Sequence, residues 1–292
     1  MNRFEKRERI RKVMKARLKF TKMGSMRFIG HLDVMRYFQK AFRRAGIQVS
    51  YSKGFSPHQI MSFASPLGLG LSSEGEYLDL SLDEEIPKEE FLQRVNTQMN
   101  EEISVTDFLY LEEESKSSMA VLAACDYLVY LKPEWSLKPE WTSFFSEEEK
   151  RRNAVERFMK KERVEILKKT KRSEKLMDIR EYIYLLSEAE EDTGSLQADF
   201  TDAGYEPLLF MQLTAGSVVN IKPELVLEAV CMDEGEEYES AAFQIHRLEM
   251  YGDLNMKKGE VHTWKSDPVC ELVPLSEYGK VVKLSNGIKF RY

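Results

Sequence analysis

Residues 13–46, VMKARLKFTKMGSMRFIGHLDVMRYFQKAFRRAG, contain two different periodicities that together indicate the fold class. Over residues 13–22 apolar and basic side chains alternate, which is typical of a half-buried strand. From Val34 onward the apolar side chains recur at three- and four-residue spacing, which predicts an amphipathic helix. Asp33 suits the start of that helix and Gly46 its end. A strand that leads directly into such a helix indicates a mixed α and β domain.

The same patterns continue along the chain in both halves. In residues 1–111, further strand signals lie at 47–52, 76–82 and 102–111, with a loop at 53–71 and a helical stripe after Pro87. Residues 112–118 are predicted to be a linker. In residues 119–292 the order recurs less regularly. Strand signals lie at 121–131, 163–169, 207–214 and 243–251, and helix signals at 146–161 and 223–231. Residues 173–205 are an ambiguous insertion with an acidic loop at 188–204, and residues 281–292 form a terminal hairpin signal. We therefore expect an α+β protein of two ferredoxin-like (βαββαβ) units in tandem, each an antiparallel sheet with its helices on one face.

Composition excludes several classes of protein. The chain has 292 residues, of which 42% are hydrophobic and 32% charged, so it can form packed cores and is not collagen-like, mucin-like or a coiled coil. No run approaches the ~18 apolar residues of a membrane span, and no apolar segment follows the basic N-terminus as in a secretory signal. Cys125, Cys231 and Cys270 are far apart and form no disulfide or metal motif. We expect a cytoplasmic protein without a tightly bound cofactor or metal and without membrane contact.

The net charge of −6 hides an uneven distribution. Residues 1–58 contain 16 Lys or Arg and 3 acidic residues, a net charge of +13, whereas residues 59–292 carry −19. Such asymmetry favours a polyanion or an acidic protein surface as a partner of the basic end. Attraction between the two halves of one molecule is the alternative.

The residues most suggestive of function lie between Gly30 and Asp79. They form the stretches Gly30-His31-Leu32-Asp33, Arg43-Arg44-Ala45-Gly46, Tyr51-Ser52-Lys53-Gly54-Phe55-Ser56-Pro57-His58, Phe63-Ala64-Ser65-Pro66-Leu67 and Ser72-Ser73-Glu74-Gly75-Glu76-Tyr77-Leu78-Asp79. In this segment the chain resembles the bacterial radical SAM-linked proteins, which share a domain of unknown function fused to, or encoded beside, a cobalamin-type radical SAM protein. The residues that match are Gly30, His31, Leu32, Asp33, Arg36, Arg43, Arg44, Ala45, Gly46, Tyr51, Ser52, Gly54, Phe55, Pro57, His58, Phe63, Ala64, Pro66, Leu67, Gly70, Ser72, Glu76, Tyr77 and Asp79. The resemblance implies a radical SAM protein as partner and assigns no activity.

A radical SAM enzyme itself is excluded, because its iron–sulfur cluster needs closely spaced cysteines. We therefore expect a non-catalytic accessory or substrate-recognition component, and RNA is the substrate that the basic half favours. The residues expected to hold the RNA backbone are Lys15, Arg17, Lys19, Arg36, Lys40, Arg43, Arg44 and Lys53. The residues expected to shape a pocket beside the helix start are His31, Asp33, Tyr51, Ser52, Phe55, Ser56, His58, Glu76 and Asp79. Alternatively, Asp79 and neighbouring acids neutralise the cations of the first strand.

Three other functions remain open at this stage. A tandem ferredoxin-like protein with a histidine after the first strand resembles CRISPR repeat-RNA endonucleases, in which His31 would be the general acid or base of metal-independent cleavage. A metal site at His31, Asp33 and His58 is less favoured than a simple turn. A scaffold that binds only protein is the last alternative. The oligomeric state cannot be deduced from the sequence.

Overall fold

The computed structural model describes residues 13–136, 144–169, 174–189, 200, 203–255, 257, 259–266, 270–278, 282–283 and 289–290. Six of the sixteen cations counted in the basic end lie before residue 13, outside the described residues. The elements of the first half are β1 (Met14–Lys22), the 3₁₀ turn η1 (Gly24–Phe28), α1 (His31–Arg44), β2 (Met61–Phe63), β3 (Ser72–Leu82), α2 (Lys88–Asn96) and β4 (Val105–Tyr110).

The second half begins with the short helix α3 (Ser118–Val121), which starts at the last residue of the predicted linker. Its elements up to the insertion are β5 (Leu122–Leu131), α4 (Pro133–Ser136), η2 (Phe144–Ser146), α5 (Glu148–Met159), β6 (Glu165–Lys169), β7 (Glu174–Asp178), η3 (Arg180–Tyr182) and β8 (Ile183–Glu188). The later elements are β9 (Glu206–Thr214), α7 (Pro223–Asp233), η4 (Ser240–Ala242), β10 (Phe243–Asp253), β11 (Leu272–Pro274), β12 (Val282–Lys283) and β13 (Lys289–Phe290).

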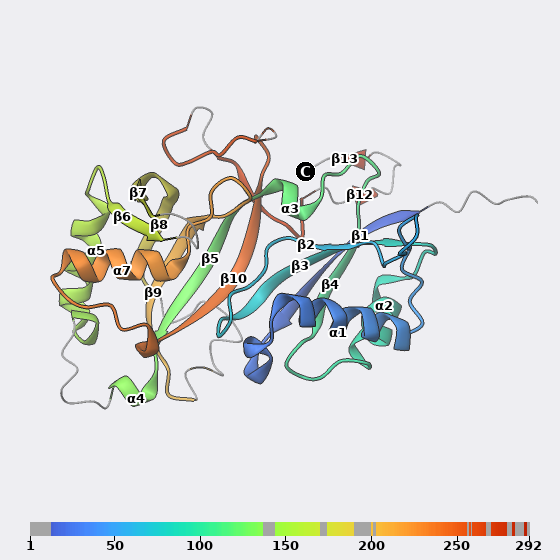
Figure 1. Cartoon of the computed structure of the whole chain (residues 1–292), viewed down its shortest axis with the longest axis horizontal. Coiled ribbons are helices and arrows are strands. Elements are labelled where there is room, and N and C mark those ends of the chain that lie inside the picture. The colour runs from blue at the N-terminus through green and yellow to red at the C-terminus, as the bar shows by residue number, and fades with distance from the viewer. Residues whose placement is uncertain are drawn as a thin grey trace, which may run out of the picture.

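One nine-stranded sheet runs through both halves in the order β4-β1-β3-β10-β5-β9-β8, with β2 beside β3 and β11 beside β10 (Figure 1). Its strand pairs are antiparallel except β3 and β10, which pair in parallel through Ser72 with His246 and Ser73 with Arg247. The protein is therefore α+β with a large, mostly antiparallel sheet. The halves share this sheet because β2 pairs only with residues 78–80 of β3 and leaves the start of β3 to β10.

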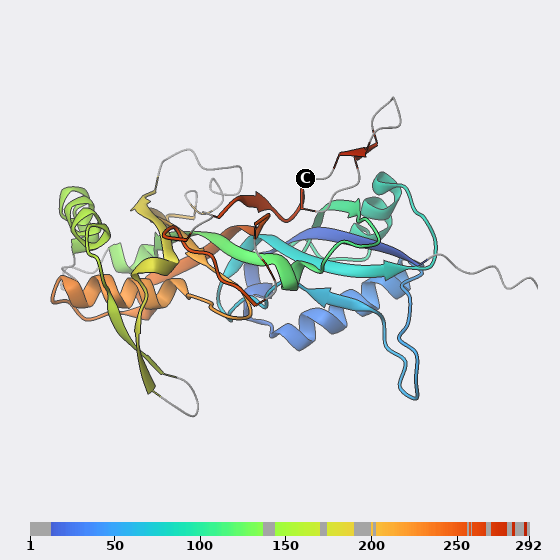
Figure 2. The same ribbon diagram turned by 90° about the horizontal axis from the view of Figure 1, so that it is seen from above.

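Helices α1 and α2 pack on the face of β1 that carries Ala16, Leu18 and Phe20. The rings of Phe38 and Phe42 on α1 are fully buried in this core, and burial of each phenylalanine side chain contributes about 2–3 kcal/mol. The second core lies between the strands of the other half and α5 and α7. Figure 2 shows the C-terminal segment, in red, on the side of the sheet opposite α1.

Helix α1 agrees with its sequence pattern. It begins after Gly30, which is extended, and carries Asp33 in its first turn and Arg43 and Arg44 in its last turn, so the charges complement the helix dipole. Gly46 follows with a φ of +66°, a left-handed conformation that favours glycine at a helix end.

Several predicted elements differ from the structure. Residues 47–52 form only the isolated bridges Val49 to Leu82 and Tyr51 to Gln59, and the second strand, β2, lies in the predicted loop. The ambiguous insertion contains β8, the edge strand of the sheet, and β6 and β7 form a separate hairpin. In the terminal hairpin β12 pairs with β13, whereas its turn lies outside the described residues. Among the described residues no helix has the length and apolar character needed to cross a membrane.

Candidate functional site

Three of the sequence stretches that carry the family resemblance meet at one hollow beside the start of α1. Its lining residues are Phe20, Lys22, His31, Val34, Phe63, Ser65, Pro66, Leu67 and Glu76, and its volume, open solvent included, is about 270 Å³. They come from β1, the first turns of α1, β2 with the loop after it, and β3. The hollow brings together His31 and Glu76, two of the residues predicted to shape a pocket.

His31 is the first residue of α1 and is partly exposed. Its ring lies edge-on to Phe63, with the two centroids 5.0 Å apart. No side-chain hydrogen bond joins His31 to another residue in the part of the chain that the structure describes. A general base normally needs a partner that orients its ring, and the described surroundings of His31 supply only the phenyl contact.

Beneath the hollow lies a buried group of charged side chains. The carboxylate of Glu76 accepts a hydrogen bond of 2.9 Å from Nη1 of Arg247, and both side chains are at most 5% exposed. Nζ of Lys22 donates to the carbonyl oxygen of Ile29 at 2.9 Å. Burial lowers the pKa of Lys22, while the negative charge of Glu76 acts in the opposite direction. Glu76 therefore compensates two buried cations.

Sequence reasoning missed Lys22 and Arg247 as parts of this group. Lys22 belongs to the alternating strand pattern, and its burial was not signalled by any motif. Arg247 lies on β10, 171 residues from Glu76, and only the parallel pairing of β3 and β10 brings the two together.

The predicted pocket residues from Tyr51 to His58 form a separate hairpin. The backbone amide of Ser52 donates to the carbonyl oxygen of His58, and Oγ of Ser52 lies 2.9 Å from Nδ1 of His58. Tyr51, Lys53, Phe55 and Ser56 are exposed, and Phe55 is without cover on any side. This hairpin projects on the same side of the sheet as α1 (Figure 2). None of its residues lines the hollow beside His31.

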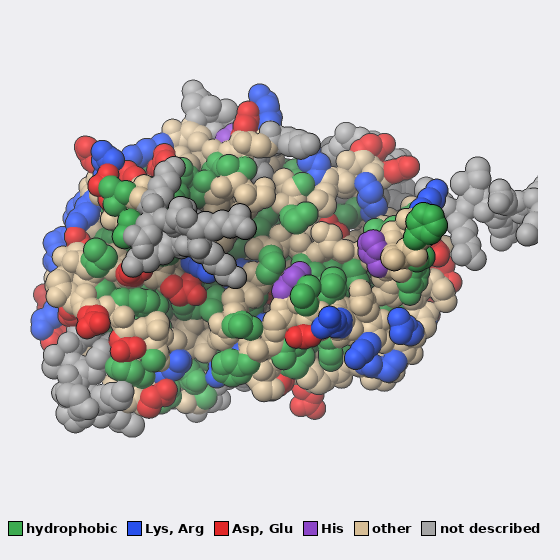
Figure 3. All heavy atoms as spheres, viewed as in Figure 1, with side chains coloured by type: hydrophobic (Ala, Val, Ile, Leu, Met, Phe, Trp, Pro, Cys, Tyr) green, Lys and Arg blue, Asp and Glu red, His purple; other side chains and the backbone are tan. Residues whose placement is uncertain are grey.

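The helix cations have the arrangement that the sequence predicts. Arg36, Lys40, Arg43 and Arg44 are exposed, and Val34, Phe38, Ala41 and Phe42 are buried on the opposite face of α1. Figure 3 shows a cluster of Lys and Arg side chains over α1. Arg36 pairs with Asp33 at 3.1 Å, and both of these side chains are more than 60% exposed. We call Arg36, Lys40, Arg43 and Arg44 the α1 cationic face.

The structure corrects the expectation that Lys15, Arg17 and Lys19 are all free to hold an RNA backbone. Arg17 is fully buried: its Nε donates to Asp79 at 2.7 Å and its Nη1 to the carbonyl oxygens of Leu275 and Tyr278 at 2.9 and 3.1 Å.

The flanking lysines are also paired. Lys19 forms an ion pair of 2.7 Å with Glu249. Lys15 donates to the backbone carbonyl oxygens of Glu113 and Ser115. The C-terminal segment therefore covers Arg17, while Lys15 stays exposed and Lys19 partly exposed. Asp79 therefore lies on the opposite face of the sheet from Glu76 and does not contribute to the hollow.

Comparison with known proteins gives a family without a known activity. A family model described as an uncharacterized protein conserved in bacteria, DUF2344, matches residues 15–223. This span includes the whole lining of the hollow and the α1 cationic face, and it ends before Arg247. No curated protein matches the chain. A solved structure of a dye-decolorizing protein from V. cholerae has 10% sequence identity and a TM-score of 0.19 over 80% of this chain and 91% of that one, and a likeness of this size carries no argument.

Proposed function

The chain belongs to the DUF2344 family of uncharacterized bacterial proteins, and from this premise we propose that it is a non-catalytic RNA-binding component that presents its RNA to a separate radical SAM enzyme in the cytoplasm. The observation that carries the RNA part of the proposal is the exposed α1 cationic face. The radical SAM partner rests on the family resemblance of residues 30–79.

The α1 cationic face has the chemistry that an RNA backbone requires. Between His31 and His58 the chain has five Lys or Arg and one acidic residue, Asp33. Each cation that contacts a phosphate releases a counterion, so binding by four of them weakens steeply with salt. The exposed rings of Tyr51 and Phe55, on a hairpin that projects from the same side, are suited to stacking on unpaired bases.

We further propose that both halves are ferredoxin-like units. The strand orders β4-β1-β3-β2 and β10-β5-β9-β8 support this. With the separate β6–β7 hairpin left out, the first four strands of each half, numbered along the chain, lie in the same order, 4-1-3-2. Many ferredoxin-like RNA binders use the open face of the sheet. Here the C-terminal segment covers Arg17 on that face, so the proposal assigns RNA to the helix side.

The test is fluorescence anisotropy of a labelled single-stranded RNA at several salt concentrations. With four phosphate contacts, each contributing about 0.7 to the salt slope, affinity falls about fifty-fold between ~50 and ~200 mM salt. The charge-reversal variant Arg43→Glu/Arg44→Glu removes two contacts, which lowers affinity by about twenty-five-fold at ~0.1 M salt.

The matched control is Lys150→Glu/Lys160→Glu, which makes the same change of charge at two exposed positions, one on α5 and one at its C-cap. We expect this control to bind RNA with nearly the affinity of the wild-type protein. Equal binding by the α1 variant and the wild-type protein overturns the proposal.

The same samples separate the two alternative functions. Cleavage of the RNA in EDTA that is lost in His31→Ala indicates an endoribonuclease. Capture of the radical SAM enzyme with no affinity for RNA indicates a protein-binding scaffold.

A further inference from the structure

The connection between β10 and β11 brings together three side chains that no sequence motif links. Asp253 is the last residue of β10, His262 lies within the connection, and Cys270 lies two residues before β11. One ligand atom of each residue, a carboxylate oxygen, an imidazole nitrogen and the thiol sulfur, lies within 4.8 Å of those of the other two. We propose that these three residues bind a Zn²⁺ ion that ties this connection to the end of β10.

The carboxylate of Asp253 is held in one orientation by the backbone. Its side chain has no exposed surface, and Oδ1 accepts hydrogen bonds from the amides of Asn255 and Glu271 at 2.9 and 3.0 Å. Oδ2 is thereby directed at Nδ1 of His262, 2.7 Å away. A carboxylate fixed in this way is prepared to bind a cation.

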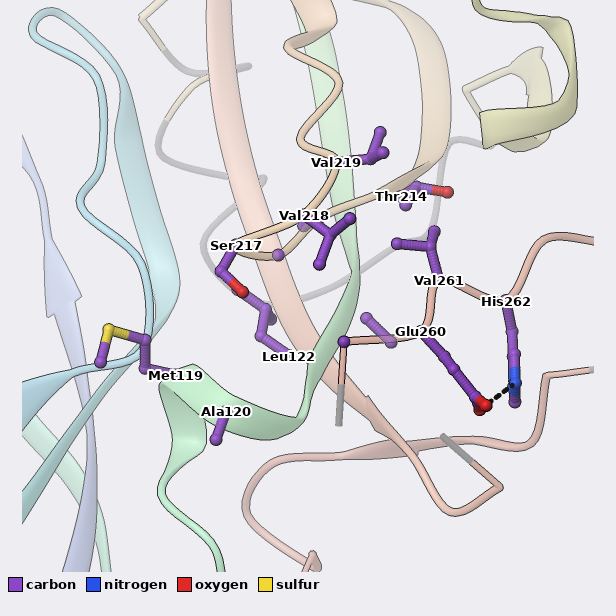
Figure 4. Close-up of a pocket in the computed structure, with 14 residues that line it drawn as sticks. Met119, Ala120, Leu122, Thr214, Ser217, Val218, Val219, Glu260, Val261 and His262 are labelled. Carbon is purple, nitrogen blue, oxygen red and sulfur yellow. Dashed lines mark ion pairs between the residues drawn. The ribbon is translucent and has the colours of Figure 1, made fainter. Parts of the chain in front are cut away.

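The other nitrogen of His262 provides independent support. Nε2 lies 3.4 Å from Oε2 of Glu260, and Figure 4 shows these two side chains meeting at one end of a hollow. In metal sites the ligating histidine almost always donates its second N–H to a carboxylate or carbonyl oxygen, which fixes the ring and its tautomer. Glu260 is in the position for that role if Nδ1 of His262 is the metal ligand.

The donor set and the spacing favour zinc. Imidazole, thiolate and carboxylate together are ligands that Zn²⁺ accepts, whereas Ca²⁺ and Mg²⁺ select oxygen. Tetrahedral bonds of about 2.0–2.3 Å place neighbouring ligand atoms about 3.5 Å apart, so a movement of about 1 Å closes the widest separation. On binding, the Cys270 thiol loses its proton to water, and the proton on Nδ1 of His262 is exchanged through water for one on Nε2, which then donates to Glu260. The His262–Asp253 hydrogen bond is thereby replaced by two bonds to the metal.

A water molecule as fourth ligand would complete the tetrahedron. His262 and Glu260 also line a hollow of about 380 Å³, open solvent included, together with residues of α3, β5 and the loop after β9, whereas Asp253 and Cys270 do not line it. No helix or strand is present in the described part of residues 254–271. A cation that joins the two ends and the middle of this connection would lower the conformational entropy of a long loop.

Cobalt substitution tests the site directly. Co²⁺ added to the metal-free protein should bind in one equivalent and give the near-ultraviolet absorption band of a cobalt–thiolate bond. Cys270→Ser should abolish the band, while Cys231→Ala, a buried cysteine outside the cluster, should keep it. Glu260→Gln should keep the band and weaken Co²⁺ affinity about ten- to a hundred-fold, because it loosens the orientation of His262.

Far-UV circular dichroism shows whether each variant is folded. The proposal is overturned if the folded wild-type protein gives no thiolate band with Co²⁺, or if the band persists in Cys270→Ser. Binding of Co²⁺ without a thiolate band also overturns the proposal, because the ion is then bound by ligands other than Cys270.

Discussion

The buried charges beneath the hollow make a sharp prediction for Glu76→Gln. The substitution keeps the shape of the side chain and removes its negative charge, which leaves Arg247 and Lys22 buried without their compensating carboxylate. Loss of one partner from a buried ion pair costs about 3–5 kcal/mol. We expect the lower end of this range, since the glutamine oxygen still accepts a hydrogen bond from Arg247. The melting temperature should then fall by about 5 °C.

Urea denaturation followed by far-UV circular dichroism measures this change. The double variant Glu76→Gln/Arg247→Met should recover most of the lost stability, because it removes the unpaired cation as well. Glu90→Gln, which breaks the exposed pair with Arg94 on α2, should cost less than about 0.5 kcal/mol. A loss below about 1 kcal/mol in Glu76→Gln, or a double variant no more stable than the single one, refutes the reasoning.

Three further predictions test the contact between β3 and β10 and the attachment of the C-terminal segment to β1. Burial lowers the pKa of His246 to about 4 from 6.5. Between these pH values the unfolded chain binds more protons than the folded chain, so acidification from pH 6.5 to 4 should lower the free energy of unfolding by about 3 kcal/mol. His246→Gln should not show this loss, and urea titrations at several pH values measure it. Gly75→Ala places a methyl group 2.4 Å from the carbonyl oxygen of Leu248, and should lower the urea midpoint by an amount equivalent to about 1–3 kcal/mol; an unchanged midpoint contradicts the close approach of the strands. Arg17→Met removes the hydrogen bonds to Leu275 and Tyr278, so limited proteolysis should cut the C-terminal segment faster than in the wild-type protein, and equal rates would mean that these bonds do not hold it.

Local periodicity is sufficient to predict an element whose apolar pattern lies within its own segment. The apolar spacing of Val34, Phe38 and Phe42 predicts α1, and alternation over residues 13–22 predicts β1. Periodicity did not predict strands whose position depends on pairing with strands far away in the sequence. β8 was ambiguous because it is an edge strand against β9, and three residues of β2 are too few to show a period.

The residues of the candidate site likewise fall into those that the local sequence pattern predicts and those that depend on residues far away in the chain. The α1 cationic face follows from the amphipathic pattern, since exposure of one helix face is a local property. The environments of Arg17 and Glu76 depend on Leu275 and Arg247, which are far away in the chain. The spacing of Asp253, His262 and Cys270 matches no common metal motif, so the cluster could be found only in three dimensions.

The hydrogen bond from Arg17 to the carbonyl oxygen of Leu275 joins residues that are 258 positions apart. This separation has a consequence for folding during translation. During translation the amino-terminal strand and its helices leave the ribosome first and are able to begin folding. The guanidinium group of Arg17 has its carbonyl partners only after Leu275 and Tyr278 have left the ribosome. A nascent chain that ends before Leu275 therefore exposes this part of the sheet to solvent.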